Sequence, residues 1–230
     1  MRSPTYATAR CVGLLAIVGI LSSGCETPGP FSDVVAGPGY TPKNSWTSTP
    51  RIESTLRRLA ILPTSSPVET MTFESGRILL NGVLRSELAR TRSFELVVVS
   101  PAQLKRWTGR EDWLSTEALP PNFAQEVLER SGCDAILLNE LTDYRPYPPL
   151  AVGWRLKLVE GTNAIVRWSV DELFDSGQPR VANSARRFYQ TNLVAAGALA
   201  DSRGVLESPE RFARYATAAA LSTLPPRASR

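Results

Sequence analysis

Residues 152–175 read VGWRLKLVEGTNAIVRWSVDELFD, and they carry the clearest structural pattern in the chain. In each half, apolar residues alternate with polar or small ones, and the turn-forming run EGTN at 160–163 separates the two halves. Alternation with period two places one set of side chains on one face of a strand, so the stretch predicts a β-hairpin with one apolar face. The apolar set is Val152, Trp154, Leu156, Leu158, Val166, Trp168 and Val170.

Upstream of the hairpin, the pattern changes to short continuous apolar runs. The runs are LAIL at 59–62, LVVV at 96–99 and AILL at 135–138, and each is bounded by polar or turn-forming residues. Runs of this length and composition predict strands that are buried on both faces.

Amphipathic segments lie between and after these runs. Val83 and Leu84 lie three and four residues after Leu80, and Leu88 lies four residues after Leu84, which predicts a helix with one apolar stripe. Ser100, Pro101 and Gln103 form the capping-box pattern of a helix start, and Gly132 is typical of a helix end. Helices are expected over 72–90, from Ser100, over 122–131, over 179–190 and over 209–223.

Strand–helix alternation followed by a hairpin predicts an α/β (α+β) domain. We expect a mixed sheet of about five strands, with the hairpin on its C-terminal side and helices packed against it. The expected organisation is a signal peptide over 1–24, a tether over 25–55 and a single domain over 56–230. The tether is predicted because its Pro, Gly, Ser and Thr residues show no apolar period, so it cannot bury enough surface to offset its ordering entropy.

The amino-terminal segment has the features of an export signal. Arg2 and Arg10 precede an uncharged run over 11–21, which is shorter than the roughly 20 residues that a membrane-spanning helix needs. The segment is therefore predicted to be a secretory signal peptide.

The sequence LSSGC at 21–25 resembles the lipobox of bacterial lipoproteins, although Ser22 occupies a position where that family usually has Leu. The resemblance implies cleavage between Gly24 and Cys25 and attachment of diacylglycerol and an acyl chain such as palmitate to Cys25. Glu26 follows in place of the Asp that marks inner-membrane retention in that family, so the resemblance favours the outer membrane, facing the periplasm. An ordinary cleaved signal with an incidental Cys is the alternative.

The order of these segments resembles a group of envelope lipoproteins. The likeness rests on LAILP at 59–63, SFELVVVS at 93–100, GCDAILLNELTDY at 132–144 and the hairpin. The group includes the curli secretion lipoprotein, the outer-membrane lipoprotein activators of penicillin-binding proteins and the amino-terminal domain of TolB. It implies a non-enzymatic protein that binds other envelope proteins or assembles into rings, over about residues 57–175.

Composition excludes several functional classes. The chain has no His, which excludes Ser-His-Asp and Cys-His catalysis and His-bearing zinc sites, and its three Cys form no CxxC motif. A net charge of +4 gives no support for nucleic-acid binding. No GxSxG or GxxxxGK[ST] motif is present, so we expect no cofactor, no metal and no enzymatic activity.

Two tyrosines are the candidate partner-binding residues. Tyr144 and Tyr147 lie with Pro146, Pro148 and Pro149 in a segment expected to be a loop before the hairpin. Exposed Tyr suits protein recognition, and loops often carry function. The alternative is turn chemistry alone.

Three further features have alternative interpretations. The acids Asp171, Glu172 and Asp175 are able to hold a divalent cation, but a structural role is favoured, in which they cap turns or pair with an arginine. The arginines considered are Arg180, Arg186 and Arg187. Trp154 and Trp168 are either hairpin core or the lining of a small-ligand pocket, and Cys133 is predicted to be a buried, unreactive thiol.

The sequence thus favours a lipid-anchored, non-catalytic adaptor or assembly component of the bacterial cell envelope. Its expected partners are the membrane, through the lipid, and envelope proteins, including copies of itself in a homo-oligomer. A module that binds a glycan or lipid is the alternative, and an enzyme is a third hypothesis that requires the carboxylates of 171–175 to converge in a cleft.

Overall fold

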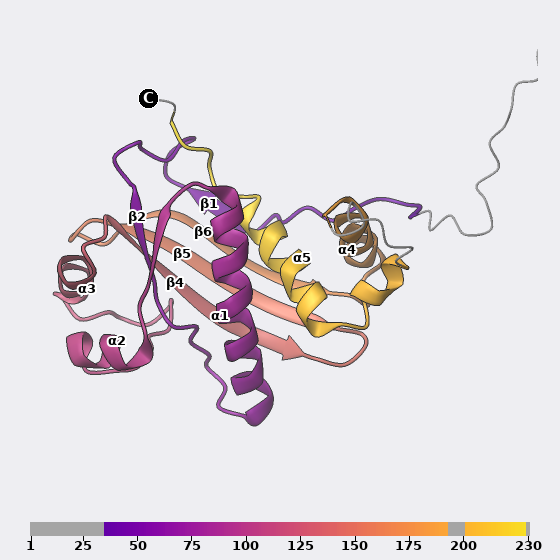
Figure 1. Ribbon diagram of the computed structural model, residues 1–230, viewed down its shortest axis with the longest axis horizontal. Coiled ribbons are helices and arrows are strands. Elements are labelled where there is room, and N and C mark those ends of the chain that lie inside the picture. The colour runs from indigo at the N-terminus through magenta and orange to yellow at the C-terminus, as the bar shows by residue number, and fades with distance from the viewer. Residues whose placement is uncertain (1–34, 193–200, 229–230) are drawn as a thin grey trace, which may run out of the picture. The chain divides into compact units, whose positions relative to one another are not determined.

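The computed structural model describes residues 35–192 and 201–228, so the signal peptide, Gly24 and Cys25 lie outside the described residues. Within these ranges the chain forms one sheet with helices on both faces (Figure 1). The strands are β1 (Ser45–Thr47), β2 (Arg58–Ile61), β3 (Glu95–Val98), β4 (Ala135–Arg145), β5 (Ala151–Glu160) and β6 (Ile165–Asp175). The helices are α1 (Met71–Thr91), α2 (Pro101–Thr108), α3 (Phe123–Ser131), α4 (Pro179–Asn192), the 3-10 helix η2 (Ser202–Val205) and α5 (Pro209–Leu221).

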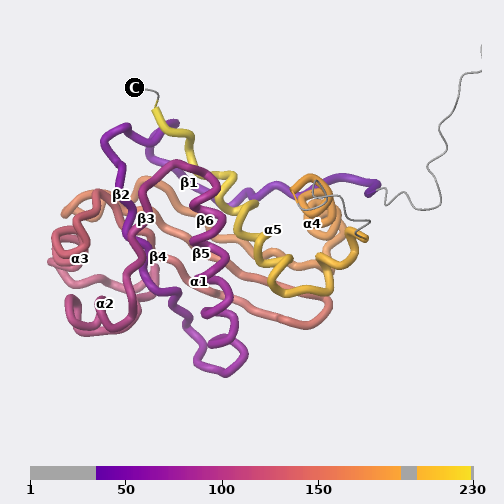
Figure 2. The backbone as a smooth tube through the Cα atoms, viewed as in Figure 1, coloured from indigo at the N-terminus to yellow at the C-terminus, as the bar shows by residue number. Residues whose placement is uncertain are grey.

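The described strands form a six-stranded mixed sheet in the order β1-β6-β5-β4-β2-β3. The strands β3, β2 and β4 are parallel to one another, whereas β4, β5, β6 and β1 are antiparallel. Parallel neighbours need a crossover connection, which α1 supplies between β2 and β3, as the course of the chain in Figure 2 shows. The predicted α/β class, mixed sheet and hairpin are confirmed, and β1 is the strand beyond the expected five.

One face of the sheet is covered by α1, α4 and α5. The predicted stripe of α1 is confirmed, because Leu80, Val83, Leu84 and Leu88 are all buried in this core. The largest buried side chains here come from the hairpin and from α5, and they include Trp154, Trp168, Phe174 and Phe212.

The helices α2 and α3 pack on the opposite face and enclose a smaller core. Ser100 caps α2 with the predicted capping box to Gln103, and Gly132 ends α3 with φ 64°, a left-handed conformation that Gly adopts without strain. This core joins residues of β2 and β4, and Leu62 directly after β2, to both helices; its members include Ala60, Leu62, Ile136, Leu138, Leu104, Phe123, Val127 and Leu128.

Two strand predictions are wrong in detail. The run at 96–99 was expected to be buried on both faces, but β3 is an outer strand of the sheet and Val98 is 50% exposed. The strand β4 extends to Arg145, so Tyr144 lies in a strand and not in a loop.

The described part of the expected tether is folded against the domain. β1 pairs with β6, and Ile52 is buried in the larger core together with Leu56, the first residue of the expected domain. The Tyr40 hydroxyl donates a hydrogen bond to Glu172. These contacts use backbone pairing and single apolar side chains, neither of which needs a periodic sequence. The compact unit therefore begins at Val35.

Candidate interaction surface

The structure separates the two candidate tyrosines. Tyr144 is only 8% exposed, and its ring packs against α1 at Gly76, where an added Cβ would lie 2.8 Å from Tyr144 Cδ1. Burial raises the pKa of its hydroxyl. The exposure on which its candidacy rested is therefore absent, and Tyr144 is a core residue.

Tyr147 has the exposure that recognition requires. It lies between β4 and β5 and is 76% exposed, next to a cis peptide bond between Pro148 and Pro149. Partner binding through Tyr147 stays a prediction.

The acids of the 171–175 segment do not converge. Asp171 pairs with Arg155 at 2.8 Å, and Asp175 pairs with Arg145 at 2.8 Å and accepts from the Gly177 N–H. Successive side chains of a strand point to opposite faces, so Glu172 lies on the face of β6 opposite to Asp171 and Asp175. The acids therefore have the structural role, and the arginines that pair with Asp175 and Asp171 among the described residues come from β4 and β5.

Glu172 shows how the amino-terminal segment is held. Its carboxylate accepts hydrogen bonds from the Tyr40 hydroxyl and from the backbone N–H groups of Lys43 and Asn44, the last at 2.7 Å. In the described ranges, no group of three acidic or Cys side chains is placed to hold a metal ion.

Both tryptophans of the hairpin are core residues. Trp154 and Trp168 are fully buried, and the Trp168 indole N–H donates to Thr223 Oγ1 at 3.0 Å. Neither side chain is therefore free to line the small-ligand pocket that was the alternative interpretation.

Cys133 is a free, buried thiol, as predicted. Its S–H contacts the Ser131 carbonyl at 3.7 Å, and burial raises the pKa of the thiol. A raised pKa leaves less of the nucleophilic thiolate at neutral pH, so Cys133 is poorly reactive.

A charged network across three strands was missed by the sequence prediction. Glu140 of β4 lies opposite Arg155 of β5, and Arg155 lies opposite Asp171 of β6. Glu140 is only 2% exposed in its side chain and pairs with Arg155 at 2.8 Å. The sequence hint of this network was Glu140, a single acid inside the apolar stretch AILLNEL at 135–141. Its partners can be identified only once the strand register is known.

The same network fixes the loop between α2 and α3. Glu140 accepts from the backbone N–H of Ser115 at 2.9 Å and from its hydroxyl at 2.7 Å, and the Lys157 ammonium donates to the Ser115 carbonyl. Burial, together with the nearby Arg155, lowers the pKa of Lys157. Both oxygens of Glu140 are thus occupied, and the network ties the loop to the sheet.

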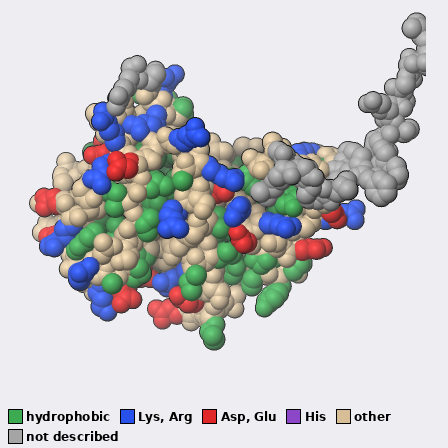
Figure 3. Space-filling model, in the orientation of Figure 1, with side chains coloured by type: hydrophobic (Ala, Val, Ile, Leu, Met, Phe, Trp, Pro, Cys, Tyr) green, Lys and Arg blue, Asp and Glu red, His purple; other side chains and the backbone are tan. Residues whose placement is uncertain are grey.

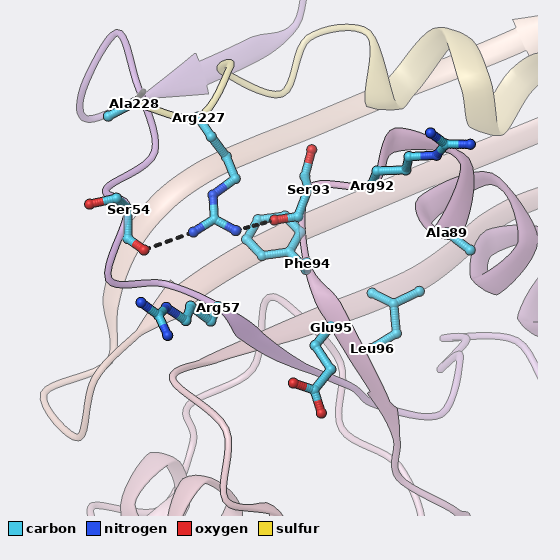
Figure 4. A pocket seen from close by; sticks show the side chains of 10 residues that line it. All are labelled: Ser54, Arg57, Ala89, Arg92, Ser93, Phe94, Glu95, Leu96, Arg227 and Ala228. Atoms are coloured by element: carbon cyan, nitrogen blue, oxygen red, sulfur yellow. Dashed lines mark hydrogen bonds between the residues drawn. The ribbon is translucent and has the colours of Figure 1, made fainter. Parts of the chain in front are cut away.

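A cavity of about 890 Å³ lies where β2 and β3 begin (Figure 4). Arg227 spans it, donating to the carbonyls of Ser93 and Ser54, and its guanidinium lies 5.8 Å from the centre of the Phe94 ring. Arg57 and Arg92 also line it. Figure 3 shows Lys and Arg side chains gathered at this end of the face, at the upper left.

The sheet and helices also leave several large apolar side chains exposed. Met71 and Ile78 are seven residues apart on α1 and therefore share one of its faces. Among the described residues, the exposed large apolar side chains are Trp46, Val68, Met71, Ile78, Val98, Tyr147, Ile165 and Leu173. Among the helices that the structure describes, none is long and apolar enough to cross a membrane.

The chain matches no protein-family model and no curated protein. Among solved structures, it is similar to the PelC dodecamer from Paraburkholderia phytofirmans, with 14% identity over 81% of this chain and 100% of that one and a TM-score of 0.42. The lipoprotein GNA1162 from Neisseria meningitidis has 15% identity over 62% and 99%, with a TM-score of 0.39. The LpoB C-terminal domain from Salmonella enterica has 18% identity over 51% and 82%, with a TM-score of 0.33. At these identities and scores, the likeness assigns no function to this chain.

Proposed function

We propose that this protein is a lipid-anchored, non-catalytic adaptor or assembly component of the bacterial cell envelope. It is exported across the inner membrane, carries its lipid on Cys25 and faces the periplasm from the outer membrane. The observation that carries the proposal is the LSSGC sequence at 21–25, ten residues before the compact unit begins at Val35.

The anchor keeps the domain close to the membrane. The chain from Cys25 to Val35 cannot exceed about 35 Å, at about 3.3–3.6 Å per residue. Three acyl chains on one Cys hold a protein far more firmly than one, because each buried methylene adds about 0.8 kcal/mol. The lipid therefore raises the effective concentration of the domain at the membrane, and its surface supplies specificity.

The internal pairing of the charged groups supports a non-catalytic role. Catalytic acids and bases need access to a substrate, yet Glu140 is buried with both oxygens occupied by Arg155 and Ser115. The acids Asp171 and Asp175 are likewise paired with arginines.

Exposed apolar and aromatic side chains support binding to other proteins. Tyr147 extends from the turn between β4 and β5, and aromatic residues of this kind contribute strongly to protein interfaces. The exposed apolar residues of α1 and β6 add further surface for envelope proteins or for another copy of the chain.

The anchor is tested by replacing Cys25. We expect Cys25→Ser to abolish incorporation of labelled palmitate and to release the protein from the membrane fraction of a bacterial host. Cys133→Ser is the matched control, because it removes a buried thiol elsewhere, and it is expected to leave labelling and fractionation unchanged. Palmitate incorporation that persists in Cys25→Ser would refute the anchor.

The adaptor role is tested by a photo-crosslinking amino acid at position 147 in intact cells. We expect a discrete crosslinked species that mass spectrometry identifies as an envelope protein or a second copy of the chain. The same amino acid at Glu129, an exposed position on α3, is the control. Identical crosslinks from both positions, or none from position 147, would contradict a binding role for this turn.

A further inference from the structure

The outer edge of β3 has free backbone groups. The N–H of Glu95 donates to the Arg57 carbonyl at 2.8 Å, and that of Val99 donates to the Ile61 carbonyl at 3.0 Å. Peptide groups of alternate residues point to opposite sides of a strand, so those of Leu96 and Val98 point away from β2. No described strand pairs with this side of β3.

This edge is weakly protected against pairing with another chain. Natural edge strands usually carry Lys, Pro or a bulge, or are kept very short. β3, with the sequence ELVV, is short and carries one charged side chain, Glu95, but it has no Lys, Pro or bulge, and Val98 is half exposed. Such an edge is a template for an added strand.

The cavity at the start of β3 carries an excess of positive charge. Arg57, Arg92 and Arg227 line it, and its one acid, Glu95, is paired with Arg58 at 3.3 Å. In Figure 4 the guanidinium groups of Arg57 and Arg92 extend to opposite sides of Phe94.

Within the described ranges, neither Arg57 nor Arg92 forms an ion pair, whereas Arg227 is held by backbone carbonyls. Arg92 also lies at the carboxyl end of α1, where a cation is favoured, and this accounts for its presence but not for that of Arg57. Two unpaired arginines on either side of an aromatic ring match the acidic side chains of a bound chain.

We propose that the outer edge of β3 binds an extended segment of an envelope protein by strand addition, and that acidic side chains of that segment bind Arg57 and Arg92. This inference rests on the proposed adaptor function and names the chemistry of the partner. Backbone hydrogen bonds from Leu96 and Val98 supply affinity, and the arginines supply the preference for acidic sequences.

The probe is a fluorescein-labelled decapeptide of alternating valine and glutamate, titrated into the mature lipidated protein in detergent. We expect saturable binding that weakens as salt rises, because ion pairs at an exposed rim are screened. Two control peptides replace glutamate with lysine or carry a methyl group on every backbone nitrogen. Neither is expected to bind, because the first lacks the charge and the second lacks the donors.

Variants assign the binding to this edge. Arg57→Gln with Arg92→Gln is expected to weaken binding by about tenfold, as two rim ion pairs would. Arg130→Gln on α3 is the control and is expected to have no effect. Val98→Pro removes an outward N–H and is expected to abolish binding, whereas Val98→Ala keeps that N–H and retains it.

Three results would overturn the proposal. The first two are binding of the lysine peptide, or of the methylated peptide, with the same affinity as the acidic peptide. The third is an oligomer of the protein that Val98→Pro dissociates, because a second copy of the chain would then occupy the edge. The methylated peptide keeps the test decisive if Val98→Pro fails to fold. Failure of the acidic peptide alongside palmitate-labelled Cys25 and a specific crosslink at Tyr147 would reject this inference and leave the adaptor function standing.

Discussion

Replacing Arg155 with Met tests whether the charged network across β4, β5 and β6 holds the fold together. Met has a similar volume but no charge, so the change leaves the carboxylate of Glu140 buried with only the donors of Ser115. The partner on the other side, Asp171, loses the same guanidinium.

The expected loss of stability follows from the exposure of each group. Removing one partner of a buried ion pair costs about 3–5 kcal/mol, and because 26% of the Arg155 side chain is exposed, we expect the lower part of that range. The Asp171 side chain is 41% exposed, so its ion pair adds only about 0.5 kcal/mol. The free energy of unfolding should therefore fall by about 3 kcal/mol in Arg155→Met.

The assay is urea unfolding followed by tryptophan fluorescence, because Trp154 and Trp168 are buried in the native core. Glu140→Gln and the double variant Glu140→Gln/Arg155→Met complete a double-mutant cycle. The double variant should be more stable than the sum of the single losses predicts, by about 1–2 kcal/mol, because it leaves no unpaired buried charge. Additive losses would refute the structural role of the network.

Three further predictions concern the core. Gly76→Ala should destabilise the protein by about 2 kcal/mol, because the added Cβ would lie 2.8 Å from Tyr144 Cδ1. Gly82→Ala places its Cβ in open space and should stabilise the helix by about 0.5–1 kcal/mol. Equal effects of the two variants in thermal unfolding would contradict this packing. Burial raises the pKa of Glu87 in the folded protein above its value in the unfolded chain, so the ionised carboxylate destabilises the fold at neutral pH and this cost disappears as the pH falls. Glu87→Gln should therefore stabilise the protein at pH 7 but not below about pH 4. Unfolding free energies that show no such pH dependence would refute this prediction. Cys133 should react with a thiol reagent only as fast as the protein unfolds, and rapid labelling of the native protein would disprove its burial.

Elements with a local period were predictable from the sequence. The hairpin and the stripe of α1 are defined by residues two or three to four positions apart, and burial of one face follows from that spacing. The caps at Ser100 and Gly132 are also local, because side chain and backbone within a few residues determine them.

The order of strands in the sheet is not a local property. The run at 96–99 has the composition of a buried strand, but β3 has a neighbour on one side only. β1 consists of Ser45, Trp46 and Thr47, which show no period, and its pairing with β6 depends on backbone groups that every sequence has.

Tyr144 was misplaced because of a single irregularity in β4. The pairing of β4 with β5 shifts between Leu141 and Asp143, and the extra residue turns Tyr144 to the same core as Leu141. Gly153 faces this bulge, where an added Cβ would lie 2.5 Å from Thr142 Oγ1. Neither the bulge nor the need for Gly153 is visible before the strands are paired.

The candidate site was predictable only in part, for the same reason. The acids at 171–175 were correctly given a structural role, but Arg155 and Arg145 become their partners through strand pairing. The arginines of the cavity, Arg57, Arg92 and Arg227, come from three separate parts of the chain.

The proposed function depends on lipid at Cys25, which holds this domain at a membrane. Mass spectrometry of the amino-terminal peptide of the protein purified from bacterial membranes tests for this lipid. We expect a chain that begins at Cys25 and carries diacylglycerol and an acyl chain on that residue. An amino terminus at any other residue, or an unmodified Cys25, would contradict it.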